Sequence, residues 1–101
     1  MNDDLKLIKL AKSNDRHALA KLLQANYAPV YKFVLKLTLN ANDAQDIVQD
    51  VMVKAIDKFH TYEPQKASVS TWMIAIAKNV WIEHLKKDKR FYACMLACDN
   101  Q

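Results

Sequence analysis

The sequence contains no glycine and only two prolines, Pro29 and Pro64. Tight β-hairpins are built largely from glycine-containing turns, so a sheet protein would have little here from which to form its connections. No apolar run approaches the ~18 residues that span a bilayer, and the first residues, including Asp3 and Asp4, are acidic rather than typical of a signal peptide. These absences predict an all-helical cytoplasmic protein without membrane insertion.

Cysteine is also scarce, with Cys94 and Cys98 as the only two. In a reducing cytosol such a pair is expected to stay as free thiols. A zinc site would need two more ligands, and the three histidines stand at no recognisable ligand spacing from the pair. No orienting acid or anion hole is evident near the cysteines, so a thiol enzyme has little support. We therefore expect no metal, no cofactor and no catalytic activity.

The 101 residues allow one small core, and charge is distributed unevenly along them. Residues 1–39 carry seven basic and three acidic groups, residues 40–59 carry two and four, and residues 60–92 carry six and three. A protein that only coats nucleic acid would be basic throughout. An acidic middle between two basic flanks instead indicates two surfaces for partners of opposite charge.

Apolar residues that recur every three or four positions predict a compact bundle of about four helices. The first helix is expected over residues 3–12, with Leu5 and Ile8 facing inward. Asp15 supplies a possible N-cap for a second helix, which continues to about residue 40. Pro29 interrupts this segment, and its missing N–H and its ring should kink or restart the helix there.

The third helix has the clearest pattern. Asn42 as N-cap with Gln45 three residues later resembles a capping box, so the helix should begin at residue 42 or 43. One uninterrupted apolar stripe follows and is expected to be core: Ala44, Ile47, Val48, Val51, Met52, Ala55, Ile56 and Phe59.

Residues 60–70 break this period and contain Pro64, so they predict a surface loop that includes Tyr62. A fourth helix is expected from about residue 70 to residue 90. Its expected inner positions are Met73, Ile76, Ala77 and Val80. Trp81 adjoins this inner face and is the better core candidate of the two tryptophans.

Two stretches at a characteristic separation resemble region 2 of bacterial sigma factors, and in particular the extracytoplasmic-function (ECF) group. They are DAQDIVQDVMVKAIDKF at residues 43–59 and STWMIAIAKNV at residues 70–80. With weaker likeness upstream, the resemblance covers roughly residues 5–92. It predicts one region 2 domain over residues 1–92, followed by a tail at 93–101 without an assigned role. The usual second domain, which reads the promoter −35 element, is missing, so the chain is either an excised domain or a naturally short form.

In this family the acidic helix docks on the clamp coiled coil of the largest subunit of core RNA polymerase. The polar side chains between positions 43 and 57 lie away from the apolar stripe. They form a ridge that could pair with arginines on a partner helix. An ordinary solvated face would look the same, and the motif favours docking. The expected polymerase-binding residues are Asp43, Asp46, Gln49, Asp50 and Asp57.

The resemblance also implies that the next loop and helix recognise and melt the promoter −10 element, chiefly through its non-template strand. An indole can stack on an unpaired base or wedge against a paired one, an amide can read a base edge, and lysines can neutralise phosphates. The hydroxyls of Ser68, Ser70 and Thr71 can cap the helix, bind phosphate or do both, and capping alone is the favoured role for Ser68 or Ser70. The expected DNA-binding residues are Lys66, Ser70, Thr71, Trp72, Lys78, Asn79, Lys86, Lys87, Lys89 and Arg90.

A second hypothesis is a polymerase-binding decoy or regulator that keeps the docking helix but opens no promoter. The missing second domain allows it, and the presence of Trp72, Asn79 and the basic helix end argues against it. An inhibitory anti-sigma factor is a further partner that the resemblance admits. The sequence identifies neither that partner nor the promoter.

Overall fold

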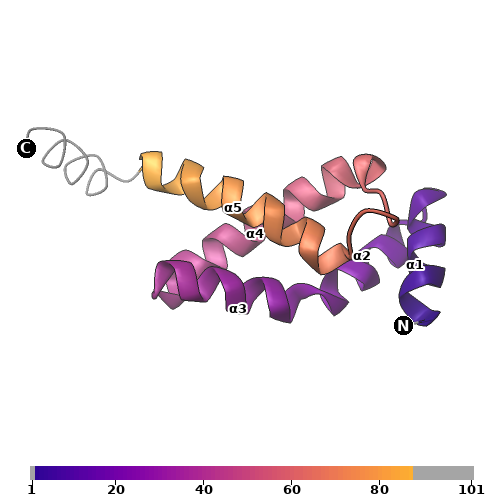
Figure 1. The fold of residues 1–101 in the computed structure, drawn as a ribbon, viewed down its shortest axis with the longest axis horizontal. Helices are drawn as coiled ribbons and strands as arrows, with labels where there is room; N and C mark the ends of the chain where they lie inside the picture. Colours follow the sequence, from indigo (N-terminus) through magenta and orange to yellow (C-terminus); the bar gives the residue numbers. More distant parts are fainter. Residues whose placement is uncertain (1, 88–101) are drawn as a thin grey trace, which may run out of the picture.

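The structure, a computed structural model, describes residues 2–87. This part of the chain folds into helices, with no strand within it, so the all-α prediction is confirmed (Figure 1). The elements, in chain order, are α1 (Asn2–Lys12), α2 (Arg16–Ala25), α3 (Tyr27–Thr38), α4 (Ala41–Lys58), the short 3₁₀ helix η1 (Phe59–Thr61) and α5 (Val69–Lys87).

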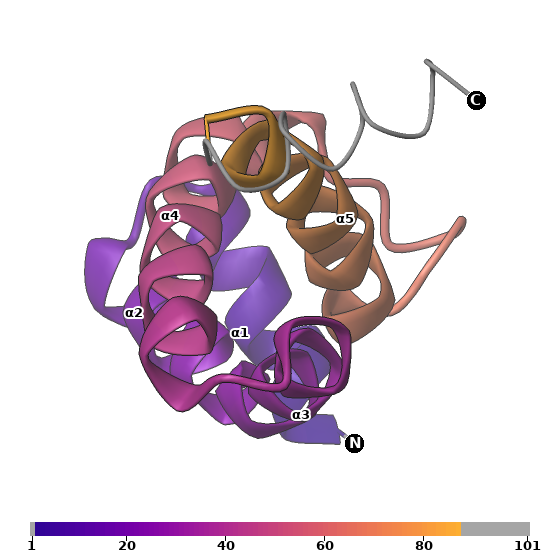
Figure 2. The ribbon, with the colours of Figure 1, turned by 90° about the vertical axis from the view of Figure 1, so that its left-hand side faces the viewer.

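Three helices, α3, α4 and α5, pack against one another around the main core (Figure 2). The helix α1 packs on α2, which in turn contacts α3 and α4. One continuous cluster of buried side chains runs through all five helices. The described helices therefore share one hydrophobic core.

The first two helices follow the sequence prediction with one exception. Asp15 caps α2, because its carboxylate accepts a hydrogen bond from the backbone N–H of Ala18 at 3.1 Å. Ile8 and Ala11 are buried against α2. Leu5 was expected to face inward and is exposed, so that assignment is wrong. It lies one turn closer to the N-terminus than the buried pair, where the bundle does not cover it.

The segment around Pro29 contains a true helix break, so the described part has five α-helices where about four were expected. The backbone leaves α2 at Asn26, whose side-chain amide donates to the carbonyl of Leu22 at 2.7 Å. The next helix then restarts at Tyr27, which makes Pro29 the third residue of α3. A residue in the first turn has no intrahelical partner for its N–H, so proline costs little there.

The N-cap of α4 is Asn40, and the predicted cap at Asn42 is wrong. The Asn40 side chain accepts hydrogen bonds from the N–H groups of Asn42 and Asp43, at 2.9 and 3.1 Å. Asn42 itself lies in the first turn, so the capping box with Gln45 does not describe this helix start. The N–H of Ala44 already donates to the backbone carbonyl of Asn40 at 2.9 Å, so the helix begins two residues before a cap at Asn42 could act.

The apolar stripe of α4 forms the centre of the core, as predicted, with one error. Five of its residues are completely or almost completely buried: Ala44, Ile47, Val48, Val51 and Ala55. Phe59 is also buried, in η1, and Met52 is half-buried. Ile56, which was assigned to the core, is 56% exposed. It lies at the edge of the stripe, in a groove of about 700 Å³ that Leu19 and Ala20 of α2 also line.

The connection between α4 and α5 is partly core rather than wholly surface. Tyr62 was placed in an exposed loop and is buried, with 3% of its surface exposed. Its ring packs on Phe59 and Trp72, and its hydroxyl donates to the carbonyl of Ala67 at 2.8 Å. The turn 63–66 projects outward from this anchor.

The last described helix, α5, begins at Val69, one residue before the predicted start. Ser68 caps it, because its hydroxyl oxygen accepts from the N–H of Thr71 at 3.3 Å. The inner positions Met73, Ala77 and Val80 are buried as expected. Ile76, predicted among them, and both tryptophans are only half-buried. Lys89, Arg90, both cysteines and the tail at 93–101 lie outside the described residues.

Within residues 2–87, no helix combines the length and apolarity needed to cross a membrane. The same residues contain no cluster of three or more histidine, cysteine or acidic side chains that could hold a metal ion.

Leu39, between α3 and α4, has a left-handed backbone with a φ of 54° and is 87% exposed. A left-handed conformation costs a residue with a Cβ about 1–2 kcal/mol, and glycine is the preferred residue after a helix end. We predict that Leu39→Gly raises the free energy of unfolding by about 1 kcal/mol in urea denaturation. Leu39→Ala, which keeps the Cβ, is the matched control. An equal gain in both variants would show that exposure of the leucine, and not its backbone conformation, is the cause.

Candidate functional site

The side of α4 opposite its buried stripe is open to solvent and carries three of the five predicted docking residues. Asp46, Gln49 and Asp57 are all exposed there. Their positions follow from the stripe, because burial of one face of a helix fixes which side chains point away. These residues are therefore available to a partner without any change in the fold.

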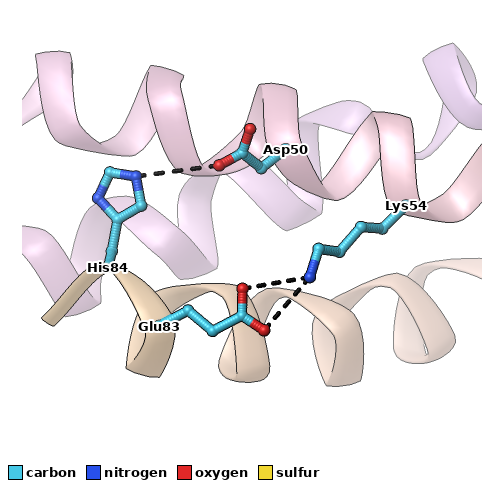
Figure 3. A network of polar contacts seen from close by, with 4 residues as sticks. All are labelled: Asp50, Lys54, Glu83 and His84. Atoms are coloured by element: carbon cyan, nitrogen blue, oxygen red, sulfur yellow. Dashed lines mark hydrogen bonds and ion pairs between the residues drawn. The ribbon is translucent and has the colours of Figure 1, made fainter. Parts of the chain in front are cut away.

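The other two predicted docking residues face α5 instead. Asp43 is half-buried in a groove of about 460 Å³, which His84 and Lys87 of α5 also line. The Asp50 carboxylate lies 3.9 Å from Nε2 of His84, a contact that becomes an ion pair when the imidazole is protonated (Figure 3). The five polar residues of α4 thus divide between an outer group and a pair directed toward α5.

One turn further along α4, Lys54 extends toward α5 and pairs with Glu83 at 3.2 Å (Figure 3). All four side chains in this network are at least one third exposed. Ion pairs of this kind contribute only about 0–1 kcal/mol each. They align α4 with α5 at the surface, while the apolar core supplies most of the packing energy.

Two exposed apolar residues extend the outer side of α4, and sequence reasoning missed both in this role. Val53 is 66% exposed and Ile56 is 56% exposed. Both follow Asp46 and Gln49 at steps of three and four, so the four residues share one face over about three turns. We call Asp46, Gln49, Val53, Ile56 and Asp57 the outer face of α4. The spacing from Asp46 could have revealed this mixed polar and apolar face.

Trp72 sits at the start of α5 in an aromatic cluster. Its ring meets Phe59 edge-on, with centroids 5.9 Å apart, and lies against Tyr62 with centroids 5.2 Å apart. Phe59 and Tyr62 stack on each other at 5.5 Å. The indole is half-buried, so it is held in place on one side and remains accessible on the other.

The hydroxyl groups beside Trp72 are used mainly for capping. Ser68 donates to the Thr71 hydroxyl at 2.9 Å and lies 3.4 Å from that of Ser70. Thr71 is nevertheless exposed, and Ser70 is half-buried. Lys66 in the preceding turn is exposed and pairs with Glu63 at 2.9 Å.

Asn79 is exposed on the side of α5 that faces α4. It lines a groove of about 310 Å³ together with Lys86 and with Lys54 and Lys58 of α4. Trp72 lies two helical turns earlier on the same side of α5, as the sequence predicts. Lys54 and Lys58 were not expected there, because only the packing of α4 on α5 brings the lysines of two helices together.

The remaining predicted basic residues are spread around α5. Lys78 lies on the α3 side, with Nζ 5.9 Å from the centroid of the Phe33 ring. Lys87 lines the groove that contains Asp43 and His84. The structure therefore brings Trp72, Asn79 and Lys86 to one side of the domain and places Lys78 and Lys87 on others.

Comparison with known proteins decides the family. A model of the family described as Sigma-70 region 2 matches residues 22–91, which is more than half of the chain. The chain belongs to the sigma-70 region 2 family. The resemblance seen in the two sequence motifs is thus confirmed, and the matched range contains α3, α4 and α5 in full.

The region 2 domain is similar to several ECF sigma factors. It is 40% identical to the ECF RNA polymerase sigma factor RpoE of Cereibacter sphaeroides over 77 residues, which are 75% of this chain and 42% of that protein. It is 31% identical to SigM of Bacillus subtilis over 61 residues, 60% of this chain and 36% of SigM. It is 28% identical to SigW of the same organism over 87 residues, 86% of this chain and 46% of SigW.

The alignments span less than half the length of each of these relatives. No solved structure matches the chain. The similarity to ECF sigma factors is therefore a similarity of sequence.

Proposed function

We propose that this domain acts in bacterial transcription initiation, where it docks on core RNA polymerase and recognises and melts the promoter −10 element. The observation that carries the proposal is the presence of two neighbouring surfaces of different chemistry. The outer face of α4 is acidic and apolar, whereas the groove between α4 and α5 gathers Asn79 with lysines. Such a pair of surfaces lets a protein partner and DNA bind at the same time.

The outer face of α4 suits a basic helical partner such as the clamp coiled coil of the largest polymerase subunit. Asp46 and Asp57 can form charge-assisted hydrogen bonds with arginines, which are stronger than neutral ones. Val53 and Ile56 offer apolar area between them that a partner can desolvate. Asp43 and Asp50 would join this interface only by giving up their positions beside α5.

The Trp72 side of α5 suits single-stranded DNA. The exposed part of the indole can stack on a base that has left the duplex, a contact that contributes about 1–3 kcal/mol per base. Asn79 can donate to and accept from a base edge, and Lys86 with Lys58 can neutralise phosphates, while Lys54 in the same groove is paired with Glu83. Melting then follows from preferential binding of the open strand and requires no catalytic group.

Residues 1–92 are proposed as the functional unit, since α1 packs on α2 and contributes Ile8 and Ala11 to the common core. This role places the domain in the cytoplasm with polymerase. An anti-sigma factor would inhibit it by covering either surface.

Replacement of Asp46, Gln49 and Asp50 by alanine is predicted to abolish capture of the chain by core polymerase or by its isolated clamp coiled coil. The three side chains are exposed, so helical content measured by circular dichroism should not change. The double variant Glu63→Ala/Glu83→Ala is the matched control, because it also removes two negative charges but from other surfaces of the domain. Undiminished capture of the triple variant would show that the docking assignment is wrong.

For DNA, we predict that the domain binds the non-template strand of a −10 element more tightly than the same sequence as duplex. Trp72→Ala and Asn79→Ala should reduce discrimination between cognate and scrambled single strands while leaving the salt dependence unchanged. Lys86→Ala/Lys87→Ala should weaken binding to cognate and scrambled single strands alike. It should also flatten the dependence of log affinity on log salt concentration, the salt slope, by about one unit per lost phosphate contact. Fluorescence anisotropy at several salt concentrations measures both effects.

These DNA titrations are best made with core polymerase present and with polymerase alone as the blank, since docking is expected to orient the domain. Equal affinity for cognate, scrambled and duplex DNA, together with a silent Trp72→Ala, would contradict the melting role.

A further inference from the structure

Lys12, the last residue of α1, makes a contact that joins distant parts of the chain. Its ammonium donates to the carbonyls of Phe59 at 3.0 Å, His60 at 3.4 Å and Tyr62. These acceptors are 47–50 residues further along the sequence. Lys12 lies at the surface of the domain, yet its ammonium is directed back onto the end of α4 and η1.

The chemistry of this contact suits lysine. Carbonyls at the end of a helix carry partial negative charge and can each accept a second hydrogen bond, and an ammonium offers three donors. The same Nζ lies 5.1 Å from the ring centroid of Phe59 and 5.7 Å from that of Tyr62, where the aromatic faces also attract a cation. Both the backbone and the rings of this segment are thus held by one side chain.

The segment that Lys12 holds is the one that fixes Trp72. Phe59 and Tyr62 form the buried side of the aromatic cluster around the indole. Tyr62 also anchors the far end of the turn through its hydrogen bond to Ala67, two residues before α5 begins. A displacement of the Phe59–Tyr62 backbone would therefore reach Trp72 through direct contacts.

We propose that Lys12 is a positioning residue that sets the orientation of Trp72 for base recognition and does not itself contact DNA. The proposal rests on the function proposed above. Its physical basis is that the ammonium is already engaged by three carbonyls, so it is not free to neutralise a phosphate. The first helix, which precedes the region matched by the family model, thereby takes part in DNA recognition.

Lys12→Met tests this role, because methionine keeps an unbranched stem and removes the donors and the charge. Lys9→Met, one turn earlier on α1 and also exposed, is the matched control. All variants carry Trp81→Phe, so that fluorescence reports Trp72 alone. Two quantities are measured: acrylamide quenching of Trp72 without DNA, and anisotropy titrations of cognate and scrambled −10 single strands at several salt concentrations with core polymerase present.

We expect Lys12→Met to increase quenching of Trp72 and to reduce the ratio of cognate to scrambled affinity about fivefold, the low end of one base stack. The salt slope should stay the same, and Lys9→Met should leave both quenching and the affinity ratio unchanged. Lys12→Arg should give intermediate values, since it keeps the charge but presents a planar fork to the carbonyls. If Lys12→Met fails to fold by circular dichroism, the arginine variant carries the test by the same criteria.

Unchanged quenching and an unchanged affinity ratio in Lys12→Met would overturn the proposal. A salt slope flatter by about one unit would overturn it too, because Lys12 would then be a phosphate contact. If the parent chain does not discriminate cognate from scrambled strands, the proposed function fails. The quenching of Trp72 would still decide whether Lys12 positions the indole.

Discussion

Burial of the apolar stripe of α4 between α3 and α5 is the interaction on which the other features depend. The stripe is almost completely buried, with at most 1% of the surface exposed for Ile47, Val48 and Val51. Replacement of a buried isoleucine by alanine typically lowers the free energy of unfolding by about 2–5 kcal/mol. A helix fixed so firmly on one side has its opposite side determined as well. The orientation of α4 therefore determines both its outer face and the groove in which Lys54 and Lys58 meet Asn79 and Lys86 of α5.

The sequence predicted the central core well, because helical periodicity is a local property of the chain. The buried positions of α4 and the inner residues Met73, Ala77 and Val80 of α5 recur at the spacing that one helix face requires. Exposure of Asp46 and Gln49 could be predicted for the same reason, and so could the position of Trp72 and Asn79 on one side of α5. The interactions of the site with its partners remain predictions.

The parts that sequence reasoning missed depend on how elements meet in three dimensions. Tyr62 is buried by contacts with Phe59, Trp72 and Ala67. Such contacts produce no regular spacing of apolar residues in a loop sequence, so periodicity could not predict them. Lys12 reaches carbonyls almost half the chain away, and no local pattern distinguishes it from other lysines of α1. The separation of Asp43 and Asp50 from the outer face of α4, and the exposure of Ile56, likewise depend on the angle at which neighbouring helices cover α4.

Opening of the promoter duplex by the chain together with polymerase can be measured with 2-aminopurine placed in the non-template strand of the −10 element. The fluorescence of this base rises when it leaves the stack. We expect the fluorescence to rise when the chain and core polymerase are both added to promoter duplex, to stay unchanged with polymerase alone, and to rise little with Trp72→Ala. Stable docking of the parent chain on polymerase without any rise in fluorescence would rule out the melting role and identify a decoy that occupies polymerase but opens no promoter.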